Sequence, residues 1–229
     1  MSKGVLKLCS YLPLKQLPYI NEVYEQNIWD VTFLNINKGL SILLTYHVLQ
    51  YSWTSRHIYW TLAELTIFNT FGSLLIYILF YDIIYASFHR LLHSSLLYNQ
   101  FHKHHHLIRF PSQGFNDAAN THPVEYGVGI YTHLLAINLF PAHIITVFIF
   151  IGLGALMSIM NHTRYEFSIP LLYNNKAHDL HHRNPTVNFG QYSQVWDRLL
   201  GTYAEWEPPV LGMKRSSHKN RIGISTSKS

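Results

Sequence analysis

The sequence predicts an all-α integral membrane protein with about four transmembrane helices and a histidine-rich helical cap on the cytosolic side. Charged residues make up only 13% of the 229 residues, whereas a soluble domain usually contains about 25%. Long apolar stretches with very few charges account for this shortfall. Most of the sixteen histidines lie between or after these stretches, in three short segments. This separation of apolar and histidine-rich sequence favours a membrane domain with a polar site at one end.

Four apolar stretches are long enough to cross a bilayer, which takes about 17–25 helical residues. They cover 31–53, 58–85, 124–140 and 142–160. Pro141 separates the last two, and because proline is unfavourable inside a helix, we expect a helical hairpin that turns there. A soluble bundle of buried helices is the alternative, but low charge and long apolar runs together favour the membrane.

The chain is expected to contain three parts. Residues 1–30 form a cytosolic or membrane-surface segment, 31–211 form the membrane-embedded domain, and 212–229 form a basic, disordered cytosolic tail. Four spans place both termini and the 86–123 loop on the same side. That side holds nearly all lysines and arginines, while Arg56 stands alone in the opposite connection. The positive-inside rule therefore makes the histidine side cytosolic.

Charge and cysteine content exclude several classes of protein. The formal net charge is +5, but the basic residues form no regular face and match no nucleic-acid-binding motif, so no nucleic-acid partner is expected. Cys9 is the one cysteine of the chain. An intrachain disulfide and a cysteine-based zinc site are therefore impossible, and imidazole becomes the available metal ligand.

The three histidine segments share a helical spacing. They contain His89 and His93; His102, His105 and His106; and His178, His181 and His182. Residues three or four apart lie on the same helix face, so we expect each segment to direct its imidazoles one way. His104 is off that face and is expected to lie outside the site. Scattered surface histidines are the alternative, but they would not repeat the His-x-x-His-His pattern.

The number of histidines indicates two metal ions. With His162, which follows the fourth apolar stretch, the candidate ligands number nine. One zinc or iron ion takes about four to six ligands, so nine imidazoles suit two ions with positions left open for oxygen or water. Imidazole binds iron, zinc, copper and nickel alike, so the spacing leaves the metal open.

Three other side chains are candidates for supporting the ligands. His122 is either a ligand or, as we favour, a residue that hydrogen-bonds to one. Asp179 and Asp197 are candidates to accept the distal N–H of ligating histidines, which would fix the tautomer and raise the basicity of the ring. Solvated charge or helix capping is the alternative role for these carboxylates.

The order of the motifs resembles the fatty acid hydroxylase superfamily, which includes sterol desaturases, C-4 methylsterol oxidases and sterol hydroxylases. The matching motifs are "HRLLH", "FHKHHH", "THPVE", "NHTRYEF", "HDLHH" and "NFGQYSQVWDRLLGTY". They cover about 81–203. The resemblance implies a non-haem di-iron centre that uses O₂, with no catalytic residue beyond the metal ligands.

The resemblance further implies a monooxygenase or desaturase of lipid biosynthesis in the endoplasmic reticulum membrane, if the source is eukaryotic. The substrate would be a sterol or, as the alternative, a fatty acyl chain or sphingolipid. The sequence has no Gly-rich dinucleotide fingerprint, so electrons from NAD(P)H would arrive through cytochrome b5 or a reductase. A membrane zinc hydrolase and a metal transporter are the alternatives from other classes.

Overall fold

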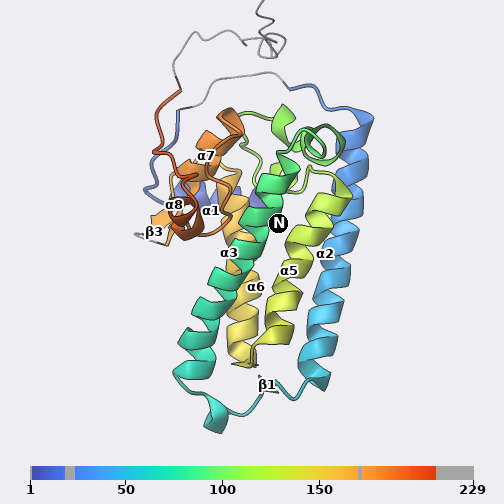
Figure 1. The fold of residues 1–229 in the computed structure, drawn as a ribbon, viewed down its shortest axis with the longest axis vertical. Helices are drawn as coiled ribbons and strands as arrows, with labels where there is room; N and C mark the ends of the chain where they lie inside the picture. The colour runs from blue at the N-terminus through green and yellow to red at the C-terminus, as the bar shows by residue number, and fades with distance from the viewer. Residues whose placement is uncertain (1, 19–23, 170–171, 210–229) are drawn as a thin grey trace, which may run out of the picture.

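The computed structural model describes residues 2–18, 24–169 and 172–209, and the predicted tail at 212–229 lies outside these residues. The described part is mostly helical. Four long helices run side by side: α2 (Ile28–Thr54), α3 (Ser73–Leu92), α5 (Pro123–Leu139) and α6 (Ile144–Asn161). They alternate in direction, so that the 93–122 connection and the segments after α6 meet at the upper end (Figure 1).

Local sequence explains where the long helices begin. Asn27 and Asp30 form a capping box at the start of α2, which satisfies backbone N–H groups that lack helical partners. Pro123 occupies the first turn of α5, where its missing N–H costs nothing. His143 precedes α6 and accepts the N–H of Ile145.

The lower end confirms the predicted hairpin. The chain turns between α5 and α6 at Pro141, and the short strand β2 (Ala142–His143) pairs in parallel with β1 (Ile58–Tyr59). The Ser73 hydroxyl donates to the Pro141 carbonyl at 2.7 Å. These bonds tie both interhelical connections together.

One predicted span begins later than expected. The apolar stretch from position 58 forms β1, the 3₁₀ turn Leu62–Glu64 and the π-helical turn Phe68–Gly72 before α3 starts. The helix then continues to Leu92, beyond the predicted end at position 85. Thr61 and Glu64 cap the 3₁₀ turn, and this local hydrogen bonding replaces helix at the start of the stretch.

Short elements assemble the upper end around the helices. α1 (Ser2–Tyr11), the π turn Tyr98–His102, the 3₁₀ turn His105–Leu107 and α4 (Phe115–Ala118) lie there. The remaining elements are β3 (Ser168–Ile169), β4 (Tyr173–Asn174), α7 (Asn175–Arg183) and α8 (Val195–Leu199). β3 and β4 form an antiparallel hairpin that leads directly into α7.

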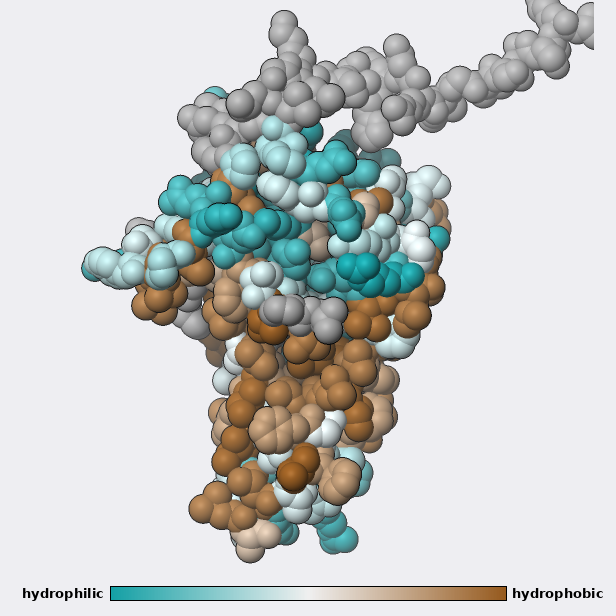
Figure 2. Space-filling view, turned by 90° about the vertical axis from the view of Figure 1, so that its left-hand side faces the viewer, coloured by the Kyte–Doolittle hydropathy of each residue, from teal (hydrophilic) through white to brown (hydrophobic). Residues whose placement is uncertain are grey.

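The surface has an apolar shaft and a polar end, which Figure 2 shows clearly. Two helices among the described residues, Phe68–Leu92 and Ile144–Asn161, are long and apolar enough to cross a membrane. On α2, Ile42 and Trp53 are 73% and 79% exposed. Exposed apolar surface of this kind marks a contact with lipid or protein. A crossing by all four helices stays a prediction.

Candidate metal centre

All nine predicted histidines come together at the upper end of the bundle, in two adjacent groups. The five-histidine group contains His89, His93, His102, His106 and His181, and the four-histidine group contains His105, His162, His178 and His182. Within each group, the candidate ligand nitrogens all lie within 4.8 Å of one another. His104 belongs to neither, as expected, because it lies against Asn120 and Asp30 at 2.9 and 3.1 Å.

The prediction that each sequence segment points its imidazoles one way holds for His89 and His93, which share a group, but is wrong for the other two segments. His102 and His106 enter the five-histidine group, but His105 enters the other. His102 ends a π-helical turn and His105 begins a 3₁₀ turn, so no regular helix face unites them. On the regular helix α7, adjacent residues diverge by about 100°, and His181 and His182 point into different groups.

Hydrogen bonds at the outer ring nitrogen fix the tautomer of four histidines. The Nδ1–H groups of His89, His162, His181 and His182 donate to backbone carbonyls at 2.7–2.9 Å. The acceptors belong to Phe189, Ser158, Val187 and Ile108, respectively. A neutral imidazole carries one proton, so in these four rings the Nε2 lone pair is free and points into the groups.

The inner nitrogens converge closely enough for each group to share one cation. His102 Nε2 lies 3.1 Å from His89 Nε2 and 3.0 Å from His106 Nε2. His178 Nε2 lies 3.2 Å from His162 Nε2 and 3.1 Å from His182 Nε2. Ligands bound at about 2.1 Å on one ion are separated by about 3.0–3.4 Å. The donor set therefore fits one metal ion in each group.

Glu125, which the sequence interpretation did not assign, supports the five-histidine group. Its carboxylate lies 2.8 Å from His102 Nδ1, and both side chains are almost fully buried. This is the position in which a carboxylate orients a ligating histidine. The sequence feature that could have drawn attention to Glu125 was its position two residues after Pro123, where it is an isolated acid in the first turn of a predicted apolar helix.

Glu125→Gln is expected to lower metal affinity about 10- to 100-fold, because the neutral amide orients His102 less strongly than the carboxylate. Metal content after dialysis against graded chelator concentrations measures the change. The exposed Glu64→Gln, in the connection at the opposite end, is the matched control. Unchanged retention in Glu125→Gln would contradict a supporting role for Glu125.

The three side chains predicted to support ligands have other partners. His122 accepts the Val124 N–H at 3.2 Å and so caps α5. Asp179 accepts from Arg164, Arg183 and Trp206. Among the hydrogen bonds of the described residues, none joins either side chain to a histidine of the two groups.

Asp197 acts on a ligand only through the backbone. Its carboxylate accepts the N–H groups of Phe189 and Gly190, each at 2.8 Å, and the Phe189 carbonyl in turn accepts from His89 Nδ1. Asp197 thus holds the loop that orients His89, instead of accepting directly from a histidine as the sequence interpretation expected.

Burial keeps the candidate ligands neutral. Loss of solvation lowers the pKa of His105 to about 3 and the pKa of His162 to about 4. It also lowers the pKa of His178, His181 and His182 well below the ordinary value. Neutral imidazole is the form that binds a metal.

The metal-free protein is expected to lose stability as the pH falls below about 6.5. Unfolded histidines bind protons there, whereas the buried ones, with lowered pKa values, do not. For His105 and His162 the loss at pH 5 is about 2 kcal/mol each. Thermal unfolding in chelator at pH 8 and at pH 5 measures it. An equal melting temperature at both values would contradict this prediction.

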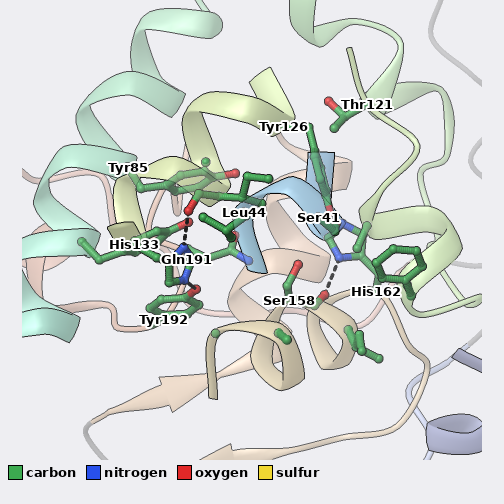
Figure 3. Close-up of a pocket in the computed structure, with 18 of the residues that line it drawn as sticks. Ser41, Leu44, Tyr85, Thr121, Tyr126, His133, Ser158, His162, Gln191 and Tyr192 are labelled. Atoms are coloured by element: carbon green, nitrogen blue, oxygen red, sulfur yellow. Dashed lines mark hydrogen bonds between the residues drawn. The ribbon is translucent and has the colours of Figure 1, made fainter. Parts of the chain in front are cut away.

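A cavity of about 240 Å³ lies between the long helices and reaches the four-histidine group. His105, His162 and His178 line it, together with tyrosines and apolar side chains from α2, α3, α5 and α6 (Figure 3). Among the described lining residues, none belongs to the five-histidine group. A molecule in the cavity would therefore meet the four-histidine group.

The sequence comparisons agree with this site. The family model for fatty acid hydroxylase matches residues 74–202, more than half of the chain, and these residues include all nine histidines. The chain belongs to the fatty acid hydroxylase family. No solved structure matches the chain.

Several curated relatives act on sterols, according to their names. The chain is 29% identical over 138 residues to lathosterol oxidase of Rattus norvegicus, covering 57% of this chain and 44% of the relative. It is 31% identical over 137 residues to the Delta(7)-sterol 5(6)-desaturase of Eremothecium gossypii, covering 57% and 37%. It is 30% identical over 141 residues to methylsterol monooxygenase 1 of Rattus norvegicus, covering 58% and 46%. The matches thus span less than half of each relative.

Proposed function

We propose that the protein is a membrane-bound oxidoreductase that uses O₂ and external electrons to hydroxylate or desaturate a lipid, and that this lipid is a sterol. One observation carries the proposal: three of the four buried imidazoles of the four-histidine group line the end of a largely apolar cavity between the long helices. The sterol-oxidising relatives support the substrate class. A fatty acyl or sphingolipid substrate is the alternative within the family.

The nine histidines would hold two iron ions, one in each group. Iron ligated by imidazoles supplies activation of O₂ for attack on an unactivated C–H bond. The protein's own task is to position the lipid and exclude water. Burial of His105, His162 and His178 removes water from the cavity end of the site. The backbone carbonyls that accept from Nδ1 hold the rings in one orientation.

Electrons would come from outside the chain, through cytochrome b5 or a reductase that uses NAD(P)H. The described residues form no dinucleotide-binding fold, because the only strands are two-stranded pairs between helical segments. The upper end, which is rich in polar side chains (Figure 2), is the surface near the histidine groups on which such a donor would dock.

We further propose four spans, with both termini and the histidine groups on the cytosolic face of the endoplasmic reticulum membrane. A glycosylation acceptor inserted after Met213 is then expected to stay unmodified in a eukaryotic cell, because it never enters the lumen. As the control, a glycosylation acceptor inserted next to Arg56, in the connection at the opposite end, should be glycosylated because that connection faces the lumen. Glycosylation after Met213 would overturn the orientation.

Metal analysis and lipid mass spectrometry test the function. The purified protein is expected to contain two iron ions per chain and to consume O₂ only with a reductant. Cells that express it should contain a sterol with one added oxygen or two fewer hydrogens, and cells that express His178→Ala should not. One zinc ion per chain and activity without oxygen would instead indicate a hydrolase. An oxidised fatty acyl chain would replace the sterol assignment.

A further inference from the structure

A hydrogen-bonded pair, His133 and Tyr192, lies within the cavity and away from the metal centre. His133 Nε2 and the Tyr192 hydroxyl are 2.5 Å apart, and both residues line the cavity. In Figure 3 they lie with Tyr85 and Gln191 on one side, whereas His162 lies on the other side with Ser41 and Tyr126. Neither residue belongs to a histidine group, so the proposed chemistry does not use them.

The direction of the hydrogen bond leaves an acceptor on Tyr192. His133 Nδ1 lies 3.1 Å from the Ile130 carbonyl, which can only accept, so the ring proton is on Nδ1. His133 Nε2 must therefore accept the Tyr192 O–H. The Tyr192 oxygen still has lone pairs, and one remains even when the neighbouring Tyr81 hydroxyl donates to it. A hydroxyl group on a bound lipid could donate to this lone pair.

The surrounding residues hold Tyr192 in this position. Asp82, a fully buried carboxylate on α3, accepts the Tyr192 N–H at 2.9 Å and the Ser193 N–H at 2.6 Å. The Tyr192 ring stacks on Tyr81 with the ring centroids 4.6 Å apart. A buried carboxylate that accepts hydrogen bonds from two backbone N–H groups holds a loop in one conformation, because such charge-assisted bonds are strong. The loop therefore presents the tyrosine at a defined depth.

Gly154 makes room for the pair on α6. A Cβ at this position would lie 2.5 Å from His133 Nε2 and 2.7 Å from the Tyr192 oxygen, so no other residue fits without displacing them. Gly154 lies on α6, eight residues before His162, which directly follows the last residue of this helix. At 1.5 Å per residue, the pair is about 12 Å from the level of the metal centre.

We propose that Tyr192 and His133 recognise the hydroxyl group of the sterol, with Tyr192 accepting its hydrogen bond, while a carbon about 12 Å away reaches the four-histidine group. This inference rests on the proposed function, and it adds the place in the cavity where the hydroxyl group of the sterol would bind. A hydroxyl buried without a partner is unfavourable, and this pair supplies one inside an otherwise largely apolar cavity. The flat tyrosine rings that line the cavity suit a flat ring system.

Equilibrium binding to the purified, metal-loaded protein in detergent tests the proposal. The probes are cholesterol and cholest-5-ene, which differ only in the hydroxyl group. The wild type is expected to bind cholesterol about tenfold more tightly, the value of one hydrogen bond. Tyr192→Phe, which keeps the ring, should reduce this preference to near one, and Gly154→Ala should do the same by displacing the pair. Tyr77→Phe, a buried tyrosine of α3 outside the cavity lining, should keep it.

Each result either supports or overturns the assignment. Thermal unfolding and metal content first show that the variants are folded. Equal binding of both probes to the wild type, binding of neither, or a full preference in Tyr192→Phe overturns it. The proposed function is separate: a hydroxyl preference without O₂-dependent oxidation leaves the recognition site and removes the activity. Oxidation without a hydroxyl preference would leave the proposed activity standing and would remove the recognition site.

Discussion

Replacement of His181 by alanine is expected to abolish lipid oxidation and to reduce the metal content to less than one ion per chain. His181 completes the five-histidine group, and its Nε2 lies 3.1 Å from His93 Nε2. Its neighbours His178 and His182 on α7 belong to the four-histidine group. Since one nine-residue helix serves both groups, loosening it at His181 should weaken retention of both ions.

Metal-to-protein ratios and O₂ consumption in purified His181→Ala test this cooperativity. Loss of a ligand should lower activity more than about 100-fold, the upper range for loss of a residue that only supports a ligand. His89→Ala tests the same group from α3. His57→Ala, an exposed histidine in the opposite connection, is the matched control and should keep both ions. One ion kept at full occupancy in His181→Ala would mean that the two groups bind independently.

Much of the architecture followed from hydropathy alone, because long apolar stretches permit few structures. All four long helices and the turn at Pro141 were predicted, and their ends fall within a few residues of the prediction except at the start and the end of α3. There, local caps at Thr61 and Glu64 outweigh the apolar character of the segment. Hydropathy does not register such hydrogen bonds, and so the predicted helix began fifteen residues before α3 does.

The histidines show a sharper limit of sequence reasoning. Their spacing, together with the position of His162 after the fourth apolar stretch, singled out nine residues that the structure brings into two groups. Spacing could not divide them into groups, since that depends on how the π and 3₁₀ turns rotate His102 and His105 apart. Each group nevertheless contains histidines from both sides of the α5–α6 hairpin, as predicted.

Partners distant in the sequence could not be predicted. Glu125 meets His102 only because α5 packs beside the π turn, and Tyr192 meets His133 only after the chain has crossed the bundle once more, through α6. Asp197 was expected to accept from a histidine and instead holds backbone N–H groups. Such contacts depend on tertiary packing, for which a single sequence carries no periodic signal.

A pair of adjacent histidines offers the most direct test of the metal centre. His105→Ala is expected to abolish oxidation and to lower metal content. Its Nε2 lies 3.3 Å from His162 Nε2, and its ring lines the cavity. His104→Ala should be far milder, because His104 contacts Asn120 and Asp30 instead of either group. The two variants remove the same side chain from neighbouring positions, so they share composition and change in charge.

Metal content, O₂ consumption and thermal unfolding of both variants decide the comparison. Oxidation in His105→Ala should fall more than about 100-fold, while in His104→Ala it should stay within about tenfold of the wild type, because only the tie to Asn120 and Asp30 is lost. Unfolding measured in chelator separates loss of metal from loss of the fold. Equal loss of activity and metal in two folded variants would place His104 in the site as well. The division of the nine histidines into two groups would then have to be abandoned. In the structure His104 contacts Asp30 of α2 and Asn120, so one ion could not bind both His104 and His105.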